Sequence, residues 1–122
     1  MTGNEPTEQS EQMALIQWAE YNRAAYPQLR LLHHIPNGGS RMKAEAGRLK
    51  AMGVKAGVPD LFLPVARGGF HGLYIELKRL ESGKASAVQR RWMEALRAEG
   101  YAVELCRGWV AASEKILDYL NL

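Results

Sequence analysis

The sequence has little of what defines several classes of protein. Cysteine occurs once in 122 residues, at Cys106, so no disulfide can form within the chain, and a reducing cytoplasm suits it. No apolar run approaches the length of a membrane span, and the polar start at residues 1–5 has no secretory hydrophobic region. Internal repeats and low-complexity tracts are also absent. We therefore expect one compact domain over residues 1–122, with residues 1–6 as a loose leader.

Positive charge, in contrast, is in modest excess. Sixteen Lys and Arg residues against 13 Asp and Glu residues give a net charge of +3, which mildly favours an anionic partner. The basic residues gather before and after the segment from 57 to 78, and those predicted to contact nucleic acid are Arg41, Lys43, Arg48, Lys50, Lys55, Arg79, Lys84 and Arg90. A basic rim of this kind suits a phosphate backbone, although a solvated helix face would have the same composition.

The apolar spacing predicts alternating helices and strands. Capping residues, glycines and prolines set the expected boundaries. Helices are expected from about 7 or 10 to 25, over 41–52, after Ser86 to about 99, and over 109–120; strands are expected at 30–35, 60–63, 73–78 and 101–106. The helix after Ser86 is expected to bury a stripe of Val88, Trp92, Ala95 and Leu96, and the last helix is expected to pack on the sheet through Val110, Ile116, Leu117 and Leu120. This order of elements predicts an α/β fold in which helices flank a small mixed sheet.

The segment from 57 to 78 is predicted to be a hairpin that carries two acids. If its turn-rich loop is symmetric, Asp60 lies opposite Glu76 and Phe62 opposite Tyr74. Residues two apart on a strand share a face, so Glu76 and Lys78 would point to the same side. A one-residue slip would turn one acid away, and the register that unites the acids also pairs the two aromatic rings. We therefore treat the acids as one site.

These residue types suit metal-dependent phosphodiester cleavage. Asp60, Glu76 and the backbone carbonyl of Leu77 offer the hard oxygen ligands that Mg²⁺ and Mn²⁺ prefer. Lys78 would orient the attacking water or take its proton, and its charge would oppose that of the phosphate. The alternative is a surface ion pair across two strands, since Glu-x-Lys is common in strands.

Other polar residues have structural explanations beside functional ones. Glu11 falls on the inward stripe of the first helix, where it is either a site residue or a first-turn acid that the helix dipole favours. Gln89 forms a capping box with Ser86. His33 and His34 are adjacent on a predicted strand, so they point to opposite faces and are not expected to ligate one metal.

Several of these motifs together resemble the VRR-NUC (virus-type replication-repair nuclease) branch of the PD-(D/E)XK nuclease superfamily. The resemblance covers about residues 10–118. The matching motifs, in order, are Glu11, Pro36-Asn37-Gly38-Gly39, Gly57-Val58-Pro59-Asp60-Leu61, Ile75-Glu76-Leu77-Lys78 and Gln89. The resemblance implies a restriction-endonuclease-like α/β/α core.

The resemblance also implies roles for individual residues. Asp60 and Glu76 would be metal ligands and Lys78 the catalytic lysine, while Glu11 would complete the acidic site, directly or through water, with Gln89 beside it. Short members of the family are similar to stand-alone bacterial or phage nucleases, and to Holliday-junction resolvases that cut branched DNA as homodimers in DNA repair. The expected function is thus a Mg²⁺- or Mn²⁺-dependent, structure-selective DNA endonuclease in the cytoplasm of a bacterial or phage-infected cell. The alternatives are a sequence-specific or single-strand nuclease of the same chemistry, and a non-catalytic nucleic-acid-binding module.

Overall fold

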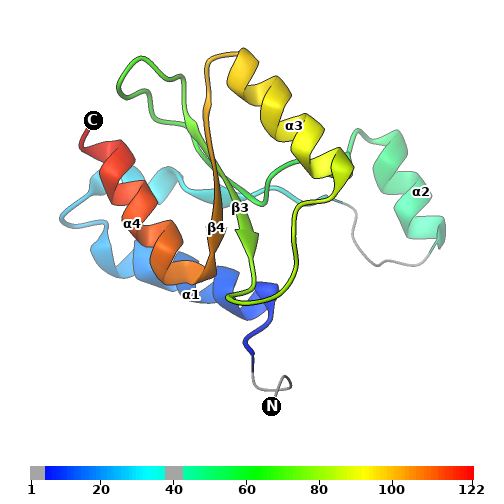
Figure 1. Cartoon of the computed structure of the whole chain (residues 1–122), viewed down its shortest axis with the longest axis horizontal. Helices are drawn as coiled ribbons and strands as arrows, with labels where there is room; N and C mark the ends of the chain where they lie inside the picture. The colour runs from blue at the N-terminus through cyan, green and yellow to red at the C-terminus, as the bar shows by residue number, and fades with distance from the viewer. Residues whose placement is uncertain (1–4, 38–42) are drawn as a thin grey trace.

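A computed structural model describes residues 5–37 and 43–122 and contains a four-stranded mixed sheet (Figure 1). The strands lie in the order β1, β2, β3, β4; β2 is antiparallel to both β1 and β3, and β3 and β4 are parallel. The elements are α1 (Glu8–Asn22), the 3-10 helix η2 (Pro27–Leu31), β1 (His33–His34), α2 (Lys43–Ala51), β2 (Leu61–Leu63), β3 (Leu73–Lys78), α3 (Ala87–Ala98), β4 (Ala102–Arg107) and α4 (Gly108–Leu120). The predicted α/β fold with a small mixed sheet is confirmed.

Helices cover both faces of the sheet. In Figure 1, α3 lies on one side of β3 and β4, while α1 and α4 lie on the other. The chain reaches β4 from β3 through α3, which is the crossover that parallel strands require. No helix in residues 5–37 or 43–122 has the length and apolar character that crossing a bilayer would take.

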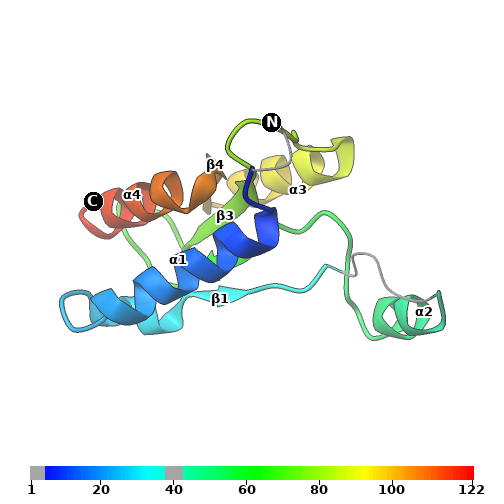
Figure 2. The same ribbon diagram turned by 90° about the horizontal axis from the view of Figure 1, so that it is seen from below.

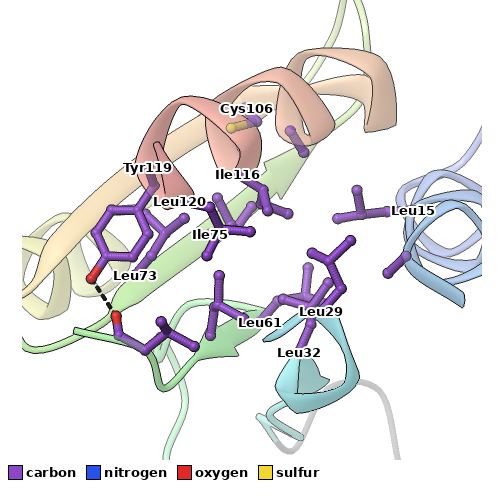
Figure 3. Close-up of a cluster of buried hydrophobic side chains, with 14 of the residues drawn as sticks. Leu15, Leu29, Leu32, Leu61, Leu73, Ile75, Cys106, Ile116, Tyr119 and Leu120 are labelled. Carbon is purple, nitrogen blue, oxygen red and sulfur yellow. Dashed lines mark hydrogen bonds between the residues drawn. The ribbon is translucent and has the colours of Figure 1, made fainter. Parts of the chain in front are cut away.

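The larger core lies between the sheet and the helices α1 and α4. Leu61 and Ile75 from the hairpin meet Leu15 of α1 and Ile116 of α4, and all four are fully buried (Figure 3). Full burial of each such side chain contributes about 1.5–3 kcal/mol. Figure 3 also shows the Tyr119 hydroxyl donating a hydrogen bond to a backbone carbonyl, so its polar end is satisfied inside the core. This core holds the hairpin rigidly from one side.

The predicted strand at 30–35 is wrong in its first half. Pro27 begins the 3-10 helix instead, and Leu29 enters the core from it. The backbone N–H of Leu32 closes this helix by bonding to the carbonyl of Leu29 at 3.1 Å, which leaves only residues 33–34 to pair with β2. The predicted helix over 41–52 is described from Lys43 onward, and its first two residues lie outside the described part.

The buried side of α3 also differs from the prediction. Met93, not Val88 or Ala95, is the buried residue of this helix, and it packs with Val103 of β4. Val110 of α4, expected to pack on the sheet, is 52% exposed. The apolar periodicity identified both helices. Each helix is, however, turned about its axis relative to the orientation that its apolar stripe predicts, so a different set of side chains faces the sheet. One consequence is that α3 keeps apolar side chains on its outer surface.

The helix α2 stands apart from the sheet. Figures 1 and 2 both show it to one side of the main body, from which the segment after α2 leads back to β2. Its composition explains this position, because the helix KAEAGRLKA has few large apolar side chains to bury. Gly53, with φ +103°, follows its last turn, as expected for a left-handed residue after a helix end.

Candidate active site

The register of the hairpin brings the two acids together. Phe62 pairs with Tyr74 as predicted, and the two rings stack with centroids 4.3 Å apart and planes 20° from parallel. Continuing the same register one residue beyond Leu61 sets Asp60 opposite Glu76. The Asp60 Oδ2 atom accepts a hydrogen bond of 2.7 Å from the backbone N–H of Leu77, which fixes this carboxylate against β3.

Glu76 is a buried carboxyl group with one unsatisfied oxygen. The residue is 1% exposed, and its Oε2 atom accepts a hydrogen bond of 3.2 Å from the Gln89 side chain. Its Oε1 atom is the buried side-chain oxygen or nitrogen that has no hydrogen-bond partner within the described residues. Burial, together with the charge of Asp60, raises the pKa of Glu76 from 4.5 to about 8. A buried oxygen without a partner is costly, so this atom is available to act as a ligand.

Lys78 is the cation of the site, at the end of the same strand. Only 5% of it is exposed, and its Nζ atom lies 3.6 Å from Glu76 Oε2. It also donates to Gln89 Oε1 at 3.0 Å and lies 4.0 Å from Glu8 Oε2. A buried ammonium is stable only where oxygen atoms surround it, and three side chains supply them here. These contacts hold the amine beside the acid pair.

Gln89 caps α3, as predicted, and also contacts both Glu76 and Lys78. Its backbone N–H and side-chain oxygen form the capping box with Ser86, at 3.2 Å and 2.9 Å. The same side chain donates from Nε2 to Glu76 and accepts at Oε1 from Lys78. The cap therefore fixes the rotamer that bridges the acid and the amine, and the two roles support each other.

Glu11 belongs to α1, and its side chain reaches the start of α4. Its side chain is 4% exposed, and Oε1 accepts a hydrogen bond of 2.9 Å from the backbone N–H of Trp109. The residue before this helix, Arg107, makes no side-chain cap of its own, so Glu11 supplies the carboxylate that a helix N-terminus favours. This contact accounts for one oxygen of Glu11, and its part in the acidic site stays a prediction.

Glu8, which in the sequence is typical of an ordinary surface acid, contributes a third carboxylate at the site. It begins α1, one turn before Glu11, and approaches the Lys78 amine from the open side. Its charge adds to the effects that raise the pKa of Glu76. The signal available in the sequence was the three-residue spacing of Glu8 and Glu11, which sets both on one helix face.

The residues before α1 pack against the loop that follows β3. The Glu5 carboxylate accepts hydrogen bonds from the backbone N–H groups of Glu81 and Ser82, at 2.6 Å and 2.9 Å. Arg79 donates to the backbone carbonyl oxygens of Glu5 and Pro6. The predicted loose leader is thus ordered at residues 5 and 6. The Arg79 guanidinium, predicted to contact nucleic acid, is engaged within the protein.

The other predicted basic contacts lie in different places. Lys50 and Lys55 are exposed on α2 and after it, Lys84 is exposed in the loop before α3, and Arg90 is exposed on α3 with a hydrogen bond to the backbone of Ala85. Arg48 is exposed and lies 4.0 Å from Glu45. Arg41 lies outside the described residues, as does the side chain of Lys43. His33 and His34 are both exposed on β1.

The donor atoms fit a divalent cation in part. The unpartnered Oε1 of Glu76 lies opposite Asp60, and such hard oxygens are the ligands of Mg²⁺ or Mn²⁺. No group of three or more His, Cys, Asp or Glu side chains suited to a metal occurs in residues 5–37 and 43–122. A cation here would therefore rely on two carboxylates, with backbone or water oxygens completing its coordination.

The fold and the site together define an α/β domain of the nuclease type. The sequence model of the VRR-NUC domain family matches residues 6–109, and the chain belongs to this family of nuclease domains. A solved structure described as a "VRR_NUC domain protein" is 34% identical, with a TM-score of 0.81 over 96% of this chain and 90% of that one. A search of curated proteins finds no match. The resemblance to the VRR-NUC family is thus confirmed.

The loop that leads to Asp60 provides a test of how tightly the site is held. Gly57 and Gly53 both have positive φ, at +92° and +103°, but only Gly57 is crowded: an added Cβ would lie 2.4 Å from Val88 and 3.0 Å from Trp92. Gly53→Ala is expected to cost about 1–2 kcal/mol of unfolding free energy. Gly57→Ala should cost roughly 1–3 kcal/mol more, because the overlap is added. Urea unfolding checks both, and equal losses would contradict the close packing.

Proposed function

We propose that the chain is a Mg²⁺- or Mn²⁺-dependent DNA endonuclease of the PD-(D/E)XK type. The observation that carries the proposal is the unpartnered Glu76 Oε1, buried opposite Asp60 and beside the Lys78 amine. Asp60 and Glu76 would hold the cation, with the Leu77 backbone carbonyl as a further oxygen ligand. When bound, a divalent cation polarises the phosphate and lowers the pKa of a coordinated water.

The side chains around the acids have separate tasks in this proposal. Lys78 would bind the attacking water, take its proton or orient it, and oppose the negative charge that develops on the phosphate. Gln89 would keep both Lys78 and Glu76 in position through the two hydrogen bonds of its amide. Glu8 would help to hold the amine in position from the open side of the site. Glu11 would complete the acidic site, directly or through water, while its hydrogen bond to Trp109 holds α1 against α4.

Branched DNA is the substrate that we propose, with two copies of the chain acting together. Short family members are similar to junction-cutting homodimers, and two sites related by a two-fold axis would suit symmetric cuts in a four-way junction. The exposed basic side chains of Lys50, Lys55, Lys84 and Arg90 support a nucleic-acid partner. The proposed cofactor is either Mg²⁺ or Mn²⁺, and the proposed setting is the cytoplasm.

A cleavage panel tests the proposal. The purified chain is given linear duplex, single-stranded, flapped and four-way DNA, each with Mg²⁺, Mn²⁺ or a chelator. We expect cleavage only with a cation, and faster cleavage of the four-way junction than of the linear duplex. Equal rates on junction and linear duplex would contradict structure selectivity. Binding without cleavage under every cation would instead favour a non-catalytic binding module. Light scattering of the protein should give the mass of two chains.

A further inference from the structure

Beside α2 and α3 lies a cleft that the acid site does not use. Its volume is about 530 Å³, within the range of small-molecule sites. The residues that line it include Asn37, Leu49, Lys50, Val54, Lys55 and Trp92. A second hollow of about 360 Å³ adjoins it through Val54, Lys55 and Trp92. Trp92 is thus shared by two adjoining hollows in the space between α2 and the main body.

Trp92 differs from the two other tryptophans of the chain. Trp18 and Trp109 pack against the large core, whereas Trp92 is not among the side chains of either hydrophobic cluster found in the described residues. It is half-buried, with one edge held against Gly57 and the rest lining the cleft. Trp92 thus presents a large, flat aromatic ring that is not buried in the core. Such a ring is available to stack on a ligand.

The charge around the cleft favours an anion. Residues 43–58 contain one acid, Glu45, and four basic residues, Lys43, Arg48, Lys50 and Lys55. Lys50 and Lys55 are exposed and line the cleft itself. Leu49 and Val54 supply an apolar wall beside them. A cationic rim, an apolar wall and an aromatic face together match the flat base and charged phosphate of a nucleotide.

The cleft lies next to the acid site. Trp92 follows Gln89 by three residues on α3, which corresponds to about 4.5 Å along the helix axis. The segment from Lys55 at the cleft to Asp60 at the site runs along the same side of α3, as the contact of Gly57 with Val88 and Trp92 shows. A DNA strand whose phosphate reaches Asp60 and Glu76 would pass the cleft with its neighbouring nucleotides.

We propose that this cleft binds an unpaired nucleotide next to the scissile phosphate, with its base stacked on Trp92 and its phosphate held by Lys50 and Lys55. The inference rests on the proposed nuclease function for its orientation, but not for the binding itself. A paired base has both faces covered by its neighbours in the duplex and cannot lie flat on Trp92. The cleft therefore favours DNA in which bases are unpaired near the cut, such as single strands and branch points.

Binding without catalysis tests the cleft independently of cleavage. The variant Trp18→Phe/Trp109→Phe leaves Trp92 as the only tryptophan of the chain, and its fluorescence is followed in chelator while oligothymidylate is added. We expect quenching that saturates with oligonucleotide. In the full chain, Trp92→Ala should weaken oligothymidylate binding about 5- to 150-fold, the effect of losing one base–aromatic stack. Trp92→Phe, which keeps a ring and the packing against Gly57, should lose less.

Matched controls separate the cleft from general charge effects. Trp109→Phe alone should leave oligothymidylate binding unchanged, and Trp92→Ala should change the binding of blunt duplex little. Lys50→Ala/Lys55→Ala should make binding less sensitive to salt. The decrease in the slope of log affinity against log salt concentration should correspond to the loss of about two phosphate contacts. Unquenched Trp92 fluorescence together with unchanged affinity of Trp92→Ala would overturn the proposal. Quenching with no cleavage under any cation would leave the cleft standing and refute the nuclease proposal instead.

Discussion

Cleavage of DNA by a Lys78→Met variant is expected to be about 10²- to 10⁴-fold slower than by the unchanged chain, the range for losing a positioned proton-transfer group. Methionine keeps much of the length of the side chain but has neither charge nor a proton to exchange. The buried amine contacts Glu76, Gln89 and Glu8, so the substitution removes the cation from the middle of the site. Single-turnover cleavage of the preferred substrate with Mn²⁺ measures the effect.

Lys115→Met is the matched control for this variant. Lys115 also pairs with a carboxylate on the sheet, at 3.5 Å from Glu104, but it is 53% exposed and lies on α4. Its replacement should leave the cleavage rate unchanged. Asp60→Ala should abolish cleavage in the same assay, because it removes the carboxylate that lies opposite Glu76 and that the Leu77 N–H holds in place. Undiminished cleavage by both Lys78→Met and Asp60→Ala would refute the assignment of the site.

The sequence was sufficient to predict the hairpin and its acid pair, for a physical reason. The side-chain period of a strand is two, so a one-residue slip would turn one acid to the other face. Only one register sets both the aromatic pair and the acid pair directly opposite each other, and the structure has Phe62 opposite Tyr74 in that register. The capping box of Ser86 and Gln89 is likewise a local pattern that a short segment fixes by itself. These features need no information about distant parts of the chain.

The features that the sequence left open depend on contacts between distant segments. The bond from Trp109 to Glu11 joins residues 98 positions apart, and the approach of Glu8 to Lys78 depends on how α1 crosses the end of the sheet. The buried side of α3 was mispredicted for the same reason, since the sheet selects Met93 and leaves Val88 exposed. Local periodicity gives the existence of a helix, while its rotation is decided by what it packs against.

Replacing Glu76 by glutamine is the second change with a large expected effect, and it should act in opposite directions on activity and stability. Cleavage should fall at least about 10²-fold, because the carboxylate opposite Asp60 is lost. Metal-free protein, however, should become more stable at high pH. The pKa of Glu76 is raised to about 8 in the folded chain by burial and by the charge of Asp60, so the ionised form is unfavourable there.

The sign of the pH dependence follows from proton linkage. Since the folded pKa of Glu76 lies above its ordinary value of 4.5, the folded state binds more protons than the unfolded state between these two values. The unfolding free energy of the metal-free chain should therefore fall as pH rises from about 4.5 to 8, by a few kcal/mol in all, and then level off. The Glu76→Gln variant lacks this dependence, so its advantage should grow over that window.

Urea unfolding at pH 5, 7 and 9 in chelator measures the difference, and repeating it with excess Mg²⁺ separates charge from metal binding. Added cation should stabilise the unchanged chain most at pH 8 and above, where Glu76 is ionised without it, and should leave Glu76→Gln nearly unaffected. Glu104→Gln is the control, since this glutamate also lies on the sheet and pairs with a lysine but is 37% exposed. A Glu76→Gln variant less stable than the unchanged chain at pH 9 in chelator would mean that Lys78 and Gln89 alone satisfy the ionised carboxylate. The unpartnered oxygen would then be no indication of a cation, and the support for a metal-dependent nuclease would rest on the family resemblance alone.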